Sequence, residues 1–474
     1  MAITRRQFIR RTGLATAGTL LAPSLFTSPL VRRAFADLGD RYLVVIFLDG
    51  GNDGLNTVVP VDDGAGTLRT DYEAARRAGN GGLRLSTASL ASTIVGNDPN
   101  TGALLALHPG LVGLTQLADS GNASLAVIQG CGYPEYNLSH EESRLIWQTA
   151  NPLRLTPLSG SGWVGRHLAA TYGPSQIPAV CVQDSIAPDF RQNVTSVLAV
   201  RRLGDFGFPW DDYGDDQAAK EAAFAALHAA ASAGSQPTQV FVGNAGTATL
   251  QSTSSYPVVH DLYQTDRGAF GQLYSEIDRR LAYDLREVAK IIYGVSSGVP
   301  GVGARFFQLS NGGYDTHSDQ GGALGQHYEL HRELGDSLKV FYDDLADMGV
   351  ADKVLTVVWS EFSRRIEQNG NGTDHGSQGP MFVIGGPNAV NGGVYGNHPN
   401  INKADLESDG NTRYRQTPHD FRSTDFRDVF GTILKHWLNM SPAQITSNVL
   451  IPDALPGEYW SVANGIDFDM GFLA

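Results

Sequence analysis

The chain has 474 residues, of which 42% are hydrophobic and 18% are charged, and its formal net charge is −14 at pH 7. An acidic protein is not attracted to nucleic acid or to anionic membrane surfaces, so the charge argues against both as partners. The length suits one large α/β domain with insertions. Cys131 and Cys181 are the only cysteines, which is too few for a disulfide framework and leaves open whether they form one bridge or remain two thiols.

Residues 1–36 have the features of a twin-arginine signal peptide. Arg5 and Arg6 lie in the motif, a modestly apolar stretch follows, and Ala34-Phe35-Ala36 forms a small-residue cleavage pattern. We therefore expect the twin-arginine translocase to export the folded protein to the periplasm or beyond, with a mature chain that begins at Asp37. No later apolar run is long enough to span a bilayer, so we expect no integral membrane segment in the mature protein.

Apolar runs alternate with helical patterns along the mature chain, residues 37–474. We expect strands at 42–48, 124–129, 179–183, 305–310, 354–360 and 381–384, and helices at 110–117, 139–149, 217–233, 260–295 and 325–348. This alternation favours an α/β fold with a mostly parallel sheet between helices. Residues 184–260 break the pattern, because an Ala-rich helix lies among Gly, Ser, Thr and Pro, and we interpret them as a cap or insertion.

The first strand ends in an acidic, glycine-rich loop. Tyr42–Leu48 is an unbroken apolar run of the kind that is buried on both faces of a parallel sheet, and Asp49 follows it directly. Ligands of such sheets bind beyond the carboxyl ends of the strands, and Gly50 and Gly51 let the backbone approach a metal ion closely. Asp49 is therefore a candidate metal ligand, although an Asx turn that closes the strand is the simpler interpretation.

Two later strands also end in potential metal ligands. Asp315 and His317 follow the strand at 305–310, and Glu361 follows the strand at 354–360, with Asp374 and His375 in the next glycine-bounded loop. Carboxylate and imidazole groups together suit zinc or a similar divalent ion. The recurrence of such residues at one sheet edge indicates a metal site.

The helix predicted at 139–149 begins with a serine. A helix start favours an anion, so Ser139 is a candidate for the nucleophile or for phosphate binding. The structural alternative is an N-cap, with Glu142 completing a capping box. His327 and His331, spaced i and i+4, each have an ordinary surface interpretation or could add a ligand.

These motifs, in this order, resemble the exported domain-of-unknown-function 1501 family. The resemblance rests on residues 47–54, 313–317, 360–365, 373–376 and 424–427. That family in turn resembles, more distantly, the alkaline phosphatase and sulfatase superfamily. The resemblance implies a three-layer α/β/α sandwich with a mostly parallel central sheet, and a two-metal site that hydrolyses phosphate or sulfate esters.

Carried over residue by residue, the resemblance makes Asp49 a metal ligand and Ser139 the nucleophile. Asp315 and His317 would belong to one metal site, and Asp374 and His375 to the other. Glu361 stands directly after the strand where the superfamily has its Asp-His pair, so whether Glu361 or Asp374 is the ligand stays open. His398 and His419 are both candidates for the final histidine, and no formylglycine-forming run occurs near Ser139.

The expected function is therefore an exported metal-dependent hydrolase of small-molecule or glycan esters. Ser139 would attack, His140 would donate a proton or orient the oxyanion, and Arg144, Arg364 or Arg365 would bind the transition state. Two divalent ions are expected, zinc first, with manganese, calcium or iron also compatible. A non-catalytic, metal-stabilised extracellular binding protein is the alternative, as is a hydrolase or lyase with another substrate.

Overall fold

A computed structural model of the protein describes residues 41–134, 136–154, 160–174, 176–207, 216–407, 423–452, 460, 466 and 468–474. The predicted signal peptide, residues 1–36, lies outside these residues, and so does His419.

The core of the fold is a nine-stranded sheet. In spatial order its strands are β13 (Gly393–Tyr395), β5 (Ser124–Gly132), β12 (Gly379–Gly385), β9 (Val354–Ser360), β1 (Tyr42–Asp49), β8 (Phe306–Gly312), β6 (Ala179–Cys181) and β7 (Val197–Ala199), and β14 (Thr424–Asp425) pairs with β5. Only β12 runs antiparallel to its neighbours, so the predicted mostly parallel sheet is confirmed.

Strand β1 lies at the centre of the sheet and is buried on both faces. Val44 and Ile46 belong to one hydrophobic core, whereas Val45 and Phe47 belong to the core on the other face. Residues of opposite parity point to opposite faces of a strand, so the unbroken apolar run reflects two covered faces. Since Asp49 pairs with Gly312 of β8, the two strands end together.

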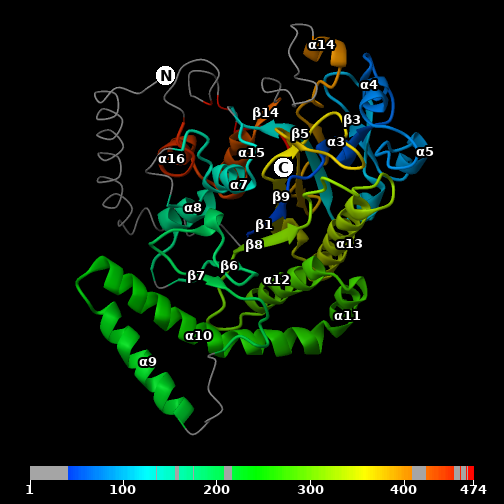
Figure 1. Ribbon diagram of the computed structural model, residues 1–474. Helices are drawn as coiled ribbons and strands as arrows, with labels where there is room; N and C mark the ends of the chain where they lie inside the picture. The colour runs from blue at the N-terminus through cyan, green and yellow to red at the C-terminus, as the bar shows by residue number, and fades with distance from the viewer. Residues whose placement is uncertain are drawn as a thin grey trace, which may run out of the picture.

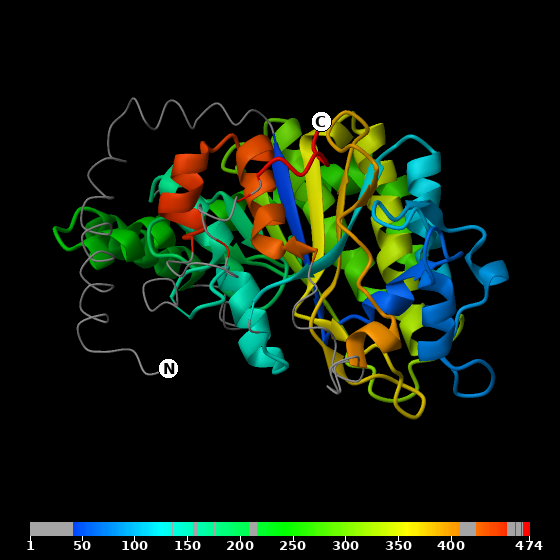
Figure 2. The ribbon, with the colours of Figure 1, turned by 90° about the horizontal axis from the view of Figure 1, so that it is seen from above.

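Helices cover both faces of the sheet (Figures 1 and 2). One core includes side chains from α6 (Val112–Asp119), α12 (Arg280–Ser296) and α13 (Gln326–Asp347), and the other includes side chains from α7 (His140–Thr149), α8 (Trp163–Thr171), α15 (Phe426–Thr432) and the π-helical turn Ile433–Trp437. The α/β class expected from the sequence is therefore confirmed.

The fold also contains several short elements. They are the helices α3 (Gly54–Thr57), α4 (Leu68–Ala75), α5 (Thr87–Leu90), α14 (Lys403–Glu407) and α16 (Pro442–Gln444), the 3₁₀ turns Pro109–Leu111, Pro188–Phe190 and Ala351–Lys353, the π-helical turn Ile445–Val449, a three-stranded sheet of β2 (Val58–Pro60), β4 (Leu104–Leu107) and β3 (Ile94–Asn97), and the pair β10 (Ser363–Arg364) and β11 (His375–Gly376).

The prediction of one helix over residues 260–295 is wrong. Three helices occupy this part of the chain, because α10 (Pro237–Asp266) and α11 (Gly268–Ile277) precede α12. Asp278 has a left-handed backbone (φ +50°) that ends α11. Helix α10 also begins well before residue 260, in a stretch whose small residues carry no helical pattern.

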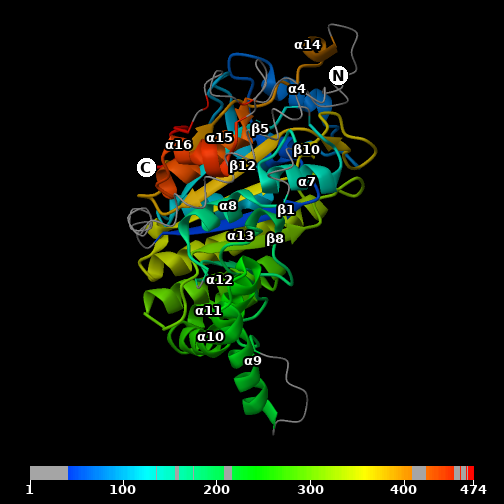
Figure 3. The ribbon, with the colours of Figure 1, turned by 90° about the vertical axis from the view of Figure 1, so that its left-hand side faces the viewer.

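Helices α9 (Gln217–Ser232) and α10 form a hairpin that makes up most of the predicted insertion, residues 184–260. Their contact uses small residues, since a side chain at Gly243 or Gly246 would overlap α9. Figure 3 shows this hairpin beyond α12, at the opposite end of the molecule from α14.

The two cysteines are buried, unpaired thiols. Cys131 lies in β5 and Cys181 in β6, and four strands separate β5 from β6. At about 4.8 Å per strand the two cysteines are on the order of 20 Å apart, far beyond the reach of a disulfide. The fold therefore excludes a disulfide between Cys131 and Cys181.

Within the described residues, no helix is long and apolar enough to cross a membrane.

Among the described residues, five histidines are buried: His108, His167, His327, His331 and His398. His327 Nε2 lies 2.9 Å from Asn52 Oδ1, and His331 Nε2 lies 3.1 Å from Thr57 Oγ1. The surface interpretation of these two residues is therefore wrong. Burial lowers the pKa of His108 to about 4 and that of His167 to about 3, and it lowers the pKa of His327 and His331 well below the usual range.

These buried histidines predict that the protein loses stability in mild acid. Below about pH 6.5 these imidazoles bind protons in the unfolded chain but stay neutral in the folded protein. Each such histidine therefore lowers the free energy of unfolding by about 1.4 kcal/mol per pH unit until its folded pKa is reached. Urea unfolding at neutral pH and near pH 5 measures the loss. His167→Gln is expected to reduce it, and the matched His228→Gln on α9 is expected to leave it as in the wild type. An equal loss in both variants would contradict this account.

Candidate metal centre

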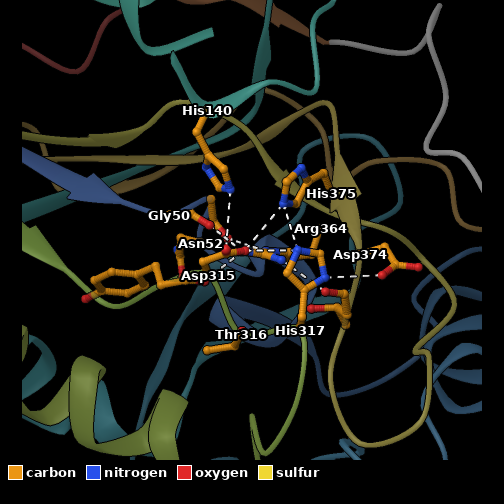
Figure 4. Close-up of polar contacts among 12 residues, drawn as sticks. Gly50, Asn52, His140, Asp315, Thr316, His317, Arg364, Asp374 and His375 are labelled. Carbon is orange, nitrogen blue, oxygen red and sulfur yellow. Dashed lines mark hydrogen bonds and ion pairs between the residues drawn. The ribbon is translucent and has the colours of Figure 1, made fainter. Parts of the chain in front are cut away.

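The carboxyl ends of β1, β8 and β9 bring the predicted site residues to one edge of the sheet. Asp49 ends β1, the loop after β8 carries Asp315 and His317, and the residues after β9 lead into β10 and β11. His375 pairs with Arg364 across these two short strands. His140 is the first residue of α7 and faces the same edge (Figure 4).

Two glycines allow the loops to approach each other. Gly50 and Gly51 both have positive φ angles, +123° and +76°. A side chain at Gly50 would overlap the backbone nitrogen of Asp315, and one at Gly51 would overlap the ring of Phe362. Only glycine can adopt these positive φ angles without strain and also leave room for such close neighbours. The two glycines therefore allow the loop that carries Asp315 to pack against the loop after β1.

Arg364 fastens these loops together. Its buried guanidinium donates to the carbonyls of Gly51 at 2.6 Å, Thr373 at 3.0 Å and Tyr314 at 3.0 Å, and also to the carbonyl of Gly50. It donates as well to Asp315 Oδ1 at 2.7 Å. A guanidinium buried in this way is bound on every side by acceptors, so Arg364 positions the loops rather than facing a substrate.

Three histidines each bind an acceptor through Nδ1. His140 Nδ1 lies 2.8 Å from Glu361 Oε1, His317 Nδ1 lies 3.2 Å from Asp374 Oδ1, and His375 Nδ1 lies 2.8 Å from the carbonyl oxygen of Leu138. A carbonyl or a carboxylate can only accept, so the network assigns the proton to Nδ1 in each ring. In its neutral form, each of these imidazoles then has a lone pair on Nε2.

These Nε2 lone pairs converge on the Asp315 carboxylate (Figure 4). His317 Nε2 lies 2.9 Å from His375 Nε2 and 3.1 Å from Asp315 Oδ1, and His375 Nε2 lies 3.3 Å from the same oxygen. His140 Nε2 is buried without a hydrogen-bond partner and lies 3.5 Å from Asp315 Oδ2. We call His140, Asp315, His317 and His375 the ligand cluster.

Three members of the ligand cluster, His140, Asp315 and His375, fit a divalent metal ion. Zinc bonds of about 2.0–2.1 Å in a tetrahedral site place the ligand atoms about 3.3 Å apart, close to the distances in the cluster. Without a cation or a proton among them, lone pairs at these distances repel each other. The acceptors behind each Nδ1 are those that orient metal-bound histidines in proteins. Among the described residues, one group of three or more side chains meets the spacing of metal ligands, and it consists of His140, Asp315 and His375.

The electrostatics of the cluster keep its carboxylate charged. Burial raises the pKa of Asp315, but the hydrogen bond and charge of Arg364 outweigh burial, so this pKa is lowered. Burial lowers the pKa of His375, which favours its neutral form. The hydrogen bond to Glu361 raises the pKa of His140. An ionised Asp315 and a neutral His375 are the forms that bind a metal ion.

The sequence left open whether Glu361 or Asp374 is a ligand. Each of these carboxylates contacts the Nδ1 atom of a cluster histidine, on the side of the ring away from Asp315. Glu361 is fully buried and accepts hydrogen bonds from the Gly50 N–H at 3.0 Å and from His140. Asp374 accepts from His317 and lies 3.7 Å from Arg365. In this geometry each carboxylate orients a ligand of the cluster.

Three other predicted residues lie beside the cluster rather than within it. Asp49 is half-exposed, and burial together with the charge of Glu361 raises its pKa. Arg144 lies 3.6 Å from Asp49. Ser139 is the N-cap of α7, but its exposed side chain makes no capping hydrogen bond.

Two further predicted elements have structural roles elsewhere. His398 is buried, and its Nδ1 lies 3.0 Å from the carbonyl oxygen of Pro399. In the motif at 424–427, Asp425 caps α15 by accepting from the Arg427 N–H at 3.0 Å, and the two side chains form a buried ion pair at 2.9 Å.

Sequence reasoning missed Gln320, which ties the site loops together from below. Its amide nitrogen donates to Asp53 at 2.6 Å, and its amide oxygen accepts from Thr316 at 3.1 Å and from Thr373 at 2.7 Å. Asp53 in turn forms a buried ion pair with Arg76 at 2.7 Å. Asp53, an acidic residue in the glycine loop after β1, was the feature of the sequence that could have indicated a buried polar partner there.

Residues 295–427 match the model of a family described as Protein of unknown function (DUF1501). The matched segment includes every residue of the ligand cluster except His140 and supports the resemblance seen in the sequence. Among curated proteins, none matches this chain.

The geometry predicts that loss of a cluster side chain abolishes tight metal binding. Asp315→Ala and His375→Ala each remove one of the converging ligand atoms, so the metal content of the purified protein is expected to fall by at least one ion per chain. Elemental analysis of protein purified without any chelator measures the metal content per chain. His228→Ala on α9 is the control. Full metal content in both cluster variants would refute the assignment.

The carboxylates behind the histidines predict a smaller effect. Glu361→Gln and Asp374→Asn each weaken the acceptor that orients an imidazole, and such changes reduce metal affinity by about 10- to 100-fold. Competition with a chromogenic chelator gives the affinity. If either variant lost metal as completely as Asp315→Ala, that carboxylate would be a ligand itself.

Proposed function

We propose that the protein is a metal-dependent hydrolase of phosphate or sulfate esters with Ser139 as its nucleophile. The observation that carries this proposal is the convergence of three imidazole Nε2 atoms on Asp315, with each Nδ1 already bound to an acceptor. Zinc suits this mixed nitrogen and oxygen set best, and manganese and iron are also compatible. Calcium fits less well, because it prefers oxygen ligands alone.

The position of Ser139 in the chain supports its role. Leu138 accepts a hydrogen bond from His375 through its carbonyl, and His140 belongs to the ligand cluster. Ser139 is therefore held between two residues that are tied to the cluster, while its hydroxyl is not used for capping. A bound divalent ion would supply Lewis-acid stabilisation of the negative charge that develops on the ester oxygens.

Positive groups on α7 support binding of an anionic ester. The free N–H groups of the first turn and the helix dipole favour an anion beside Ser139. Arg144 follows His140 by one turn and lies on the same side of the helix. Its side chain is partly exposed and only 3.6 Å from Asp49, so it can bind the equatorial oxygens of the transition state.

The two-ion site expected from the sequence, and with it the superfamily resemblance, remains part of the proposal. We assign Asp49 to a second ion, because it is the carboxylate beside the cluster that binds no histidine there. Asp49→Asn is then expected to remove one ion and leave the other. We also propose that the protein acts after export through the twin-arginine pathway, on a small-molecule or glycan ester.

One observation favours the alternative of a non-catalytic, metal-stabilised binding protein. Burial raises the pKa of Asp49, and the charges of Glu361 and Asp315 raise it further. These three carboxylates lie near one another, so an anionic ester would have to approach several negative charges. Metal binding without turnover would support this alternative.

Nitrophenyl phosphate and nitrophenyl sulfate test the catalytic proposal. The zinc-loaded protein is expected to hydrolyse at least one of them, and Ser139→Ala is expected to reduce the rate on the order of 10³-fold with unchanged metal content, because the attacking oxygen is lost. Ser86→Ala, at the N-cap serine of α5, is the matched control and should keep full activity.

Each result distinguishes the candidates. Hydrolysis that survives Ser139→Ala would exclude the serine nucleophile but retain a metal-dependent hydrolase. A protein that binds zinc and hydrolyses neither ester, nor a panel of other phosphate and sulfate esters, would contradict the proposed activity.

A further inference from the structure

A polar pocket lies between the loop after β7, α10 and α12. Its volume is about 330 Å³, and its lining includes three basic side chains, three acidic side chains and one histidine: Arg202, Arg286 and Lys290, Asp205, Asp261 and Glu287, and His260. It shares no residue with the ligand cluster. The size suits a small organic molecule.

Lys290 is unusual among the lysines of the chain. There are six, namely Lys220, Lys290, Lys339, Lys353, Lys403 and Lys435. Lys290 alone among them is buried, with 1% of its side chain exposed. A buried amine at a pocket wall is the environment in which lysine becomes a nucleophile.

Two groups beside Lys290 can take up its proton. Lys290 Nζ donates to Glu287 Oε1 at 2.7 Å and lies 3.1 Å from His260 Nδ1. Glu287 is held in place, since its other oxygen accepts from the Leu203 N–H at 3.0 Å. His260 packs directly against Gly204, where a side chain would leave the ring little room.

The pocket favours the unprotonated, nucleophilic form of the Lys290 amine. Burial lowers the pKa of Lys290, and the opposing charge of Glu287 does not fully compensate. Burial and the charge of Lys290 also lower the pKa of His260, which favours its neutral form, and the Nδ1 of that form can accept a hydrogen bond from Lys290.

Arg286 supplies a positive charge that no carboxylate neutralises at close range. Within the described part of the chain it forms no ion pair, its Nε is buried without a hydrogen-bond partner, and its Nη1 donates to Ser275 Oγ at 3.1 Å. Arg286 precedes Lys290 by four residues on α12, so both lie on the same side of the helix. A guanidinium in this state fits a carboxylate ligand.

We propose that this pocket binds a small oxo acid, an aldehyde or ketone that carries a carboxylate, and that Lys290 forms an imine with its carbonyl carbon. Arg286 binds the carboxylate. The Lys290 amine, after giving a proton to Glu287 or His260, attacks the carbonyl carbon and forms a C–N bond. The carbonyl oxygen leaves as water with the two remaining amine hydrogens, so no oxidant or reductant is needed.

Reductive trapping with glyoxylate tests the imine in the wild-type protein. Borohydride delivers hydride to the imine carbon and leaves a carboxymethyl group on the lysine, which peptide mass spectrometry locates. In the folded protein Lys290 is expected to be modified at least 10-fold faster than the exposed Lys353, and this preference is expected to disappear in urea. If Lys290 is modified no faster than Lys353 in the folded protein, the imine is refuted.

A second comparison tests the carboxylate. Arg286→Gln is expected to raise the glyoxylate concentration for half-maximal trapping about 10-fold and to leave trapping of acetaldehyde, which has no carboxylate, unchanged. Arg279→Gln, at an exposed arginine that pairs with Glu329, is the matched control. An equal effect of Arg286→Gln on both aldehydes would overturn the role of Arg286. Unchanged Lys290 trapping in His375→Ala would separate this pocket from the metal centre.

Discussion

Three imidazole lone pairs and one carboxylate meet at the carboxyl end of the sheet, and they require a positive charge among them. The requirement follows from the hydrogen bonds on the far side of each ring, because Glu361, Asp374 and the Leu138 carbonyl hold the protons on Nδ1. In their neutral forms the rings then direct Nε2 lone pairs at Asp315. The hydrogen bonds at Nδ1 thus determine the tautomer and the orientation of each ring. These hydrogen bonds in turn depend on the positions of three loops and of the start of α7.

The loops are held by groups that bind backbone rather than ligand. Arg364 connects the loop after β1, the loop after β8 and the loop between β10 and β11 through their carbonyls, and Gln320 joins the last two through Thr316 and Thr373. Buried donors of this kind are costly unless each finds an acceptor. A loop shift would leave several of them unpaired at once, so the same contacts that satisfy Arg364 also fix the ligand cluster.

The ligand cluster and the Lys290 pocket differ in their charges. Carboxylates and imidazoles surround the ligand cluster, which favours a cation. The Lys290 pocket is lined by both basic and acidic side chains, and Arg286 forms no ion pair among the described residues, so it is the group there that suits a carboxylate ligand. They also lie on different parts of the fold, since the centre uses the strand ends and α7, whereas the pocket uses α10, α12 and the loop after β7. The insertion that sequence patterns suggested as a cap thus builds a second pocket with α12.

The sequence by itself determined which segments form the central strands and that Asp49, Asp315 and Glu361 share one edge. An apolar run followed by a glycine loop is a local signal, and parallel strands end together. Tertiary structure alone decided that His140 joins the cluster and that Glu361 and Asp374 orient histidines, because the direction of an imidazole lone pair depends on partners up to 237 residues away in the chain. It also decided the start of α10, whose small residues have no helical pattern but pack against α9, and the separation of the two cysteines by four strands.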